Sequence, residues 1–120
     1  MAKKDLLGRR GEDDACTYIK RLGMTVLERN FRCNFGEVDI VALDEHDIVF
    51  IEVKTRSSVK YGEPIEAVNY YKRQHLRRCA EAYMKMHWIS GKSYRIDIAE
   101  VLVIEGKSYI RYTKDAIGEE

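Results

Sequence analysis

The chain has few cysteines, a single proline and no long hydrophobic run. Its three cysteines are odd in number, widely spaced and form no C-x-x-C pair, which argues against a disulfide framework or zinc site and favours a reducing compartment. No apolar segment approaches the roughly 18 residues of a membrane span, and the N-terminus lacks an apolar signal sequence. We therefore expect a cytoplasmic protein without membrane contacts. Because no linker or low-complexity tract divides the sequence, we expect a single domain over residues 1–120.

Net charge is also nearly absent. The 21 basic residues almost balance the 20 acidic ones, for a formal net charge of +1. This balance neither requires nor excludes nucleic acid, so any binding surface has to come from local clusters of basic residues. One cluster includes Arg77 and Arg78, which form either a solvated helix face or a track for a nucleic-acid backbone.

The hydrophobic pattern predicts two helices and five strands. Apolar residues at helical spacing predict a helix over residues 11–22, ended by Gly23, and a second that starts at Pro64 and continues to about His87. Runs rich in β-branched and apolar residues predict strands over 25–31, 38–43, 48–54, 94–104 and 108–112. The order of helix, three strands, helix and two strands predicts an α/β sandwich with a mixed sheet.

Asp39, Glu52 and Lys54 interrupt two strands that are otherwise apolar. A turn over residues 44–47, of either two or four residues, sets a register in which Asp39 faces Glu52. Because strand side chains alternate, Glu52 and Lys54 lie on one face and Val53 lies on the other. The sequence therefore places two carboxylates and an ammonium group on one face of a hairpin.

Two carboxylates in these opposed positions repel each other. At ~5 Å and an effective dielectric of about 20 the repulsion is roughly 3 kcal/mol, whereas a favourable cross-strand pair contributes only about 0.2–1 kcal/mol. A cation must lie between the acids, or one acid must keep its proton. Lys54 supplies part of the charge, and Mg²⁺, which takes oxygen ligands, would supply more. The alternative is a solvated sheet edge where Glu52, Lys54 and Glu37 pair, but the surrounding apolar residues disfavour it.

Around these residues the sequence resembles a known family. Asp39 followed by Glu52-Val53-Lys54 resembles the PD-(D/E)XK nuclease superfamily of restriction endonucleases and archaeal Holliday-junction resolvases. Val38 stands where the superfamily name has proline, which is not a metal ligand. A wider set of residues, spanning about 8 to 104, is similar to the bacterial YraN family of predicted endonuclease-like proteins: Gly11-Glu12, Ala15, Arg29-Asn30, Gly36-Glu37-Val38-Asp39, Glu52-Val53-Lys54-Thr55-Arg56, Gly62, Pro64, Lys72 and Arg95-Ile96-Asp97.

The resemblance implies a restriction-endonuclease-like three-layer αβα sandwich and a DNA endonuclease that depends on Mg²⁺ or Mn²⁺. It implies metal ligands at Asp39, Glu52 and the Val53 carbonyl. Lys54 would orient or help deprotonate the attacking water and offset charge on the phosphate. A junction substrate would need two active sites and hence a symmetric homodimer. The alternative is a protein without enzymatic activity, namely a nucleic-acid-binding or adaptor protein that keeps the nuclease fold.

Further residues are candidates either for the site or for structural roles. Glu12 is either a first-turn acid favoured by the helix dipole or, as the resemblance implies, a catalytic member of the acidic cluster. Lys72 interrupts the apolar stripe of the second helix and either extends to solvent or reaches a substrate phosphate. Arg56, two residues beyond the E-x-K motif, is a candidate phosphate ligand. Arg95 and Asp97 share a strand face and predict a structural ion pair.

Overall fold

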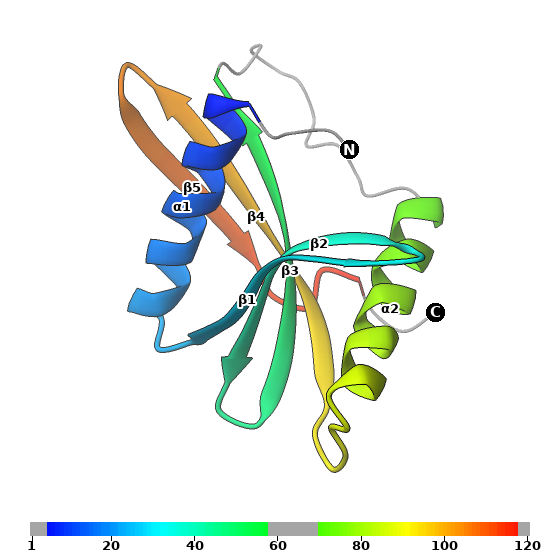
Figure 1. Cartoon of the computed structure of the whole chain (residues 1–120). Coiled ribbons are helices and arrows are strands. Elements are labelled where there is room, and N and C mark those ends of the chain that lie inside the picture. Colours follow the sequence, from blue (N-terminus) through cyan, green and yellow to red (C-terminus); the bar gives the residue numbers. More distant parts are fainter. Residues whose placement is uncertain (1–4, 58–69, 118–120) are drawn as a thin grey trace.

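The computed structural model describes residues 5–57 and 70–117, which form a mixed sheet with a helix on each face (Figure 1). The elements follow the predicted order: α1 (Leu6–Arg21), β1 (Thr25–Cys33), β2 (Gly36–Asp44), β3 (Asp47–Arg56), α2 (Tyr70–Met86), β4 (Tyr94–Ile104) and β5 (Lys107–Thr113). The strands lie side by side in chain order, with β3 and β4 parallel and the other neighbours antiparallel. The predicted α/β fold with a mixed sheet is confirmed.

Element boundaries differ from the prediction in one important place. α1 begins at Leu6 rather than Gly11, because Asp5 caps the helix and its Oδ1 accepts a hydrogen bond from the Gly8 amide at 2.7 Å. The apolar stripe does not mark this polar cap. The predicted start of the second helix at Pro64 lies outside the described residues. Neither α1 nor the described part of α2 is long and apolar enough to span a bilayer.

Both faces of the sheet are covered, and β3 contributes to each core. Val49 and Ile51 pack in the core beneath α1, whereas Ile48 and Phe50 pack in the core beneath α2. This alternation follows from the two-residue period of a strand. Because both faces of the central strand are buried, its sequence reads as a nearly continuous apolar run. Figure 1 shows α1 and α2 on opposite sides of the sheet.

α1 approaches β3 most closely at Gly11. A Cβ atom at this position would lie 1.8 Å from Thr55 Oγ1 and 2.7 Å from Thr55 Cβ. Thr55 is β-branched and has little freedom to move aside. This contact explains a glycine inside a helix, where it costs roughly 0.5–1 kcal/mol relative to alanine. The next residue, Glu12, is consequently held against the sheet and is 1 % exposed.

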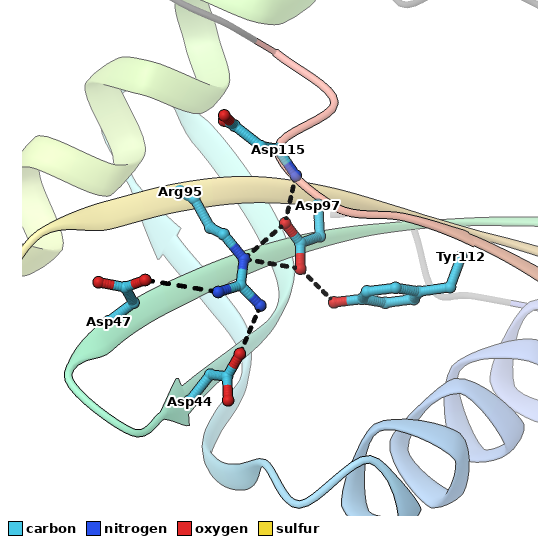
Figure 2. A network of polar contacts seen from close by, with 6 residues as sticks. All are labelled: Asp44, Asp47, Arg95, Asp97, Tyr112 and Asp115. Atoms are coloured by element: carbon cyan, nitrogen blue, oxygen red, sulfur yellow. Dashed lines mark hydrogen bonds and ion pairs between the residues drawn. The ribbon is translucent and has the colours of Figure 1, made fainter.

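A buried ionic network joins β4 to its neighbours (Figure 2). Asp97 is fully buried and accepts hydrogen bonds from Arg95 Nε at 3.1 Å, the Tyr112 hydroxyl at 2.5 Å and the Asp115 amide at 2.8 Å. The Arg95 guanidinium also reaches the two aspartates beside the β2–β3 turn, Asp44 at 2.8 Å and Asp47 at 3.5 Å. The predicted Arg95–Asp97 pair is confirmed, as the centre of a network that connects β2, β3, β4 and β5.

We expect Tyr112→Phe to lower the free energy of unfolding by about 1–3 kcal/mol, because the buried Asp97 carboxylate loses a donor. Burial, and then the hydrogen bond to Asp97, raise the pKa of Tyr112, so the hydroxyl keeps its proton over the usual assay range. Urea denaturation measures the loss. Tyr109→Phe on the same strand is the matched control: Tyr109 is 56 % exposed, and its change should stay within about 0.5 kcal/mol. Equal losses in both variants would contradict the role of the Tyr112 hydroxyl.

Candidate functional site

The candidate site lies where β2 and β3 separate. The ladder between the two strands ends at Ile40 and Ile51, in the predicted register. Beyond this point β2 continues along β1, whereas β3 continues along β4. Figure 1 shows the β1–β2 hairpin turning toward α2 while β3 runs on in the sheet. Asp39 and Glu52, which come next in the register, therefore flank an opening in the sheet.

The hairpin bends at Asn30, which lies opposite Asp39 in the β1–β2 register. Asn30 has a φ of 55°, a left-handed conformation that asparagine tolerates better than most residues. Residues two apart in a regular strand share a face. Here, however, Arg29 contacts α1 and Phe31 packs in the core beneath α2. The left-handed residue thus turns the hairpin tip toward α2 and places Asp39 at the bend.

Asp39 and Glu52 are each only 9 % exposed. Asp39 Oδ2 accepts a hydrogen bond from the Val53 amide at 2.7 Å. The carboxylate thus takes the place of a backbone carbonyl of β2 as the acceptor for this amide. Glu52 Oε1 lies 3.2 Å from Lys72 Nζ on α2. Burial, and then the charge of Asp39, raise the pKa of Glu52 to about 7, while Lys72 and Lys54 oppose the rise. Glu52 is therefore close to half protonated at neutral pH, which relieves the repulsion in one of the two expected ways.

The alternative of a solvated sheet edge is wrong for Glu52, because its side chain is only 9 % exposed and pairs with Lys72 of α2. Glu52 contacts α2 and Val53 packs toward α1, so the predicted alternation holds. Arg56 ends β3 on the same alternating face as Glu52 and Lys54. Lys72 reaches inward to Glu52 while its side chain stays 45 % exposed. The structure thus brings a second lysine to the acids.

Glu12 lies on α1 and contacts β1, at the residue opposite Asp39. It comes after the first turn of α1, so its interpretation as a first-turn acid is wrong. Glu12 Oε1 accepts hydrogen bonds from Arg29 Nε at 2.9 Å and Asn30 Nδ2 at 3.0 Å. Glu12 also lines a pocket of about 300 Å³ together with Val53, the residue whose amide binds Asp39.

Asp39 and Glu52 are the two carboxylates at this opening that could bind a cation. Within residues 5–57 and 70–117, no three His, Cys, Asp or Glu side chains are grouped to hold a metal ion, so Glu12 does not join the pair in a three-carboxylate centre. Asp39 and Glu52 could nevertheless provide two carboxylates to Mg²⁺ or Mn²⁺, which prefer oxygen ligands. A cation between them would relieve the repulsion that raises the pKa of Glu52.

Comparison with known proteins identifies the family. Residues 11–101 match the family described as "Uncharacterised protein family UPF0102". The chain belongs to this family. A UPF0102 protein of Arthrobacter sp. is 48 % identical over 102 residues, which cover 85 % of this chain and 86 % of that protein. A UPF0102 protein of Caldicellulosiruptor saccharolyticus is 46 % identical over 101 residues, covering 84 % and 85 % respectively.

A UPF0102 protein of Clostridium botulinum is 47 % identical over 98 residues, covering 81 % of this chain and 80 % of that protein. The YraN family is UPF0102, so the family resemblance seen in the sequence is confirmed. The matched range includes every predicted catalytic, metal-binding and substrate-binding residue.

In this UPF0102 member the two adjacent arginines of α2 have different neighbours. Arg78 Cζ lies 5.7 Å from the centroid of the Phe35 ring, at the tip of the bent hairpin. Arg77 instead acts on Tyr94 at the start of β4: burial raises the pKa of that phenol, and Arg77 opposes the rise. Arg78 thus lies at the hairpin, and the charge of Arg77 acts on Tyr94 at the start of β4.

Arg29 and Asn30 both bind Glu12, a role that the sequence pattern did not predict. A signal for them is nevertheless present in the chain. Three adjacent polar residues, Glu28, Arg29 and Asn30, interrupt a predicted strand, and asparagine is enriched at left-handed backbone positions. Only the packing of α1 against the sheet shows what they bind.

We expect Glu52 to make stability decrease as pH rises from about 4.5 to 7. Its pKa in the folded protein, about 7, is above the ordinary 4.5, so the folded state holds a proton that the unfolded state releases. The difference corresponds to about 3 kcal/mol at most. Glu52→Gln should flatten the dependence of the unfolding free energy on pH, measured by urea denaturation.

Glu45→Gln, in the exposed β2–β3 turn, is the matched control and should keep the parent's pH dependence. Retention of the parent's slope by Glu52→Gln would contradict the assignment of the titrating group to Glu52.

Proposed function

We propose that this protein is a divalent-metal-dependent DNA endonuclease of the PD-(D/E)XK type, which hydrolyses phosphodiester bonds. One observation supports the proposal above the others. The two acids of the D…E-x-K pattern lie where the central strands separate, and Lys54 is close enough to Glu52 to oppose the rise in its pKa. A buried pair of acids with adjacent lysines suits the binding of a cation and a phosphate.

Asp39 and Glu52 would hold Mg²⁺ or Mn²⁺, with the Val53 carbonyl as a further oxygen ligand. When bound, such a cation polarises a phosphate and lowers the pKa of its water. Glu52 has to be ionised to act as a ligand, so the cation competes with the proton that this carboxyl holds near pH 7. Metal affinity should therefore increase as pH rises through 7.

The cationic residues would act on the substrate. Lys54 would orient or help deprotonate the attacking water and offset charge that develops on the phosphate. Lys72, which pairs with Glu52 at 3.2 Å, is exposed enough to turn to a phosphate oxygen once a cation neutralises that carboxylate. Arg56, at the end of β3, and Arg78, at the hairpin tip, would contact the DNA backbone on either side.

Glu12 stays a candidate catalytic residue with a structural contribution as well. Its carboxylate binds Asn30, the left-handed residue opposite Asp39. Through this contact Glu12 stabilises the bend that places Asp39 at the opening. Removal of Glu12 would therefore disturb Asp39 even if Glu12 binds no metal.

The second candidate function is a nucleic-acid-binding or adaptor protein that keeps the fold without cutting. Two observations favour it. Lys72 already supplies positive charge to Glu52. In the part of the chain that the structure describes, no third acid joins the pair to form a metal centre. An ammonium group in place of a metal would preserve the site while removing its hydrolytic chemistry.

We expect Asp39→Asn to abolish cleavage, because the substitution removes one of two proposed anionic ligands. Isothermal titration should show weaker Mg²⁺ binding, while DNA affinity should persist or increase because one anion near the phosphates is lost. Lys54→Ala should keep metal binding and lower the turnover rate by about 10²–10⁴-fold, since its proposed role is in the transition state. Both effects are measured on branched and linear DNA.

Glu105→Gln, in the exposed β4–β5 turn, is the control for loss of an acid and should cleave as the parent does. Should the parent cut no DNA with Mg²⁺ or Mn²⁺, and both variants bind DNA as it does, the adaptor function replaces the nuclease.

The position of Arg78 generates a prediction about salt. The logarithm of DNA affinity should fall linearly with the logarithm of salt concentration. Arg78→Glu should flatten that slope by about one counterion or more, because a phosphate contact is lost. Arg77→Glu, one residue away but acting on Tyr94 of β4, changes charge equally and should affect the slope less. A slope for Arg78→Glu that equals the parent's would exclude the hairpin side of α2 as the DNA path.

A further inference from the structure

Two of the three cysteines meet next to the candidate site. Cys33 ends β1 and Cys79 lies on α2, 46 residues further along the chain. Cys33 Sγ and Cys79 Sγ share a hydrogen bond, and the two sulfur atoms are 3.1 Å apart. Both residues are free thiols. Their wide spacing in the sequence argued against a disulfide framework, yet the bend of the β1–β2 hairpin brings them together.

The hairpin tip packs closely around Cys79. The Phe35 amide donates a hydrogen bond to Cys33 Sγ at 3.4 Å. A Cβ atom on Gly36 would lie 3.9 Å from Cys79 Sγ, in ordinary van der Waals contact. Cys79 is only 1 % exposed, whereas Cys33 is half-buried. A small oxidant from solvent therefore reaches Cys33 first.

We propose that Cys33 and Cys79 are a redox-responsive thiol pair that a peroxide closes into a disulfide and a dithiol reopens. The Cys33 sulfur attacks hydrogen peroxide and breaks its O–O bond, which gives a sulfenic acid and one water. Cys79 sulfur then attacks the Cys33 sulfur, and the hydroxyl leaves as a second water with the Cys79 proton. Two thiols are oxidised and one peroxide is reduced. A dithiol such as dithiothreitol returns both thiols and becomes a disulfide itself.

The surroundings of the two thiols agree with this order of events. Burial, and then the hydrogen bond with Cys33, raise the pKa of Cys79 to about 12, which makes Cys79 a poor first nucleophile. Cys33, which accepts the hydrogen bond of the Phe35 amide, is the more exposed of the two thiols and so meets the peroxide first. The sulfur atoms have to approach by about 1 Å to reach the ~2.05 Å length of a disulfide.

Closure of the pair would fix the hairpin to α2 beside the candidate site. Asp39 lies at the base of this hairpin, and Lys72 lies two turns before Cys79 on the helix. The disulfide would therefore hold together the two elements that carry an acid and a lysine of the site. The inference does not depend on nuclease activity, and its test requires neither DNA nor metal.

The experiment treats the full chain with hydrogen peroxide, alkylates it under denaturing conditions and measures its mass and peptide map. We expect an intramolecular loss of about 2 Da, from two hydrogens, and a peptide linking Cys33 to Cys79, both reversed by dithiothreitol. The oxidised form should have a Tm several degrees higher than the reduced form, because the cross-link restricts the unfolded chain. Cys16→Ala, which removes the third thiol, should retain all three results.

Cys33→Ser and Cys79→Ser should show neither the mass loss, nor the linked peptide, nor the higher Tm. Circular dichroism verifies that each variant is folded. If a variant does not fold, the peptide map of the oxidised parent still shows whether Cys33 and Cys79 are linked. The proposal is overturned if peroxide leaves both thiols of the folded parent free to be alkylated, links them to other chains, or oxidises Cys33 beyond sulfenic acid without forming the bond.

Discussion

The hydrogen bond from the Val53 amide to Asp39 Oδ2 makes the separation of β2 and β3 possible. The β2–β3 ladder ends at Ile40 and Ile51. If no other group accepted a hydrogen bond there, a backbone N–H of β3 would be unpaired, at a cost of about 1–3 kcal/mol. Asp39 supplies the missing acceptor, and the same bond holds its carboxyl group beside Glu52. The opening in the sheet and the proximity of the acids are therefore two results of one interaction.

The charged side chains at the two ends of β3 have different partners. At its start, the Arg95 guanidinium forms ion pairs with Asp44, Asp47 and Asp97 and so holds β2, β3 and β4 together (Figure 2). At the opening, Asp39 accepts a hydrogen bond from the Val53 amide, Glu52 pairs with Lys72, and Glu52 holds its proton up to about pH 7. Stability and protonation are consequently linked through one carboxyl group, and the proposed binding of a cation would be linked to both. An opening of this kind is expected where binding, rather than folding, determines the choice of residues.

The sequence by itself determined the features that depend on local periodicity. The order of elements follows from alternating helical and strand patterns, and the position of Glu52 and Lys54 on one face follows from the two-residue period. The β2–β3 register could also be predicted, because a turn of two residues and a turn of four residues pair the same residues. The Arg95–Asp97 pair belongs to this group, since its members are two residues apart on one strand.

Only the tertiary structure decided the contacts between elements far apart in the chain. Lys72 reaches Glu52, and Cys79 reaches Cys33, because α2 packs against a hairpin that bends at Asn30. No periodicity encodes that bend, since it arises from one left-handed residue whose effect depends on the strand beside it. The partners of a buried carboxylate such as Glu12 are likewise selected by helix packing on the sheet, which places donors from another strand around it.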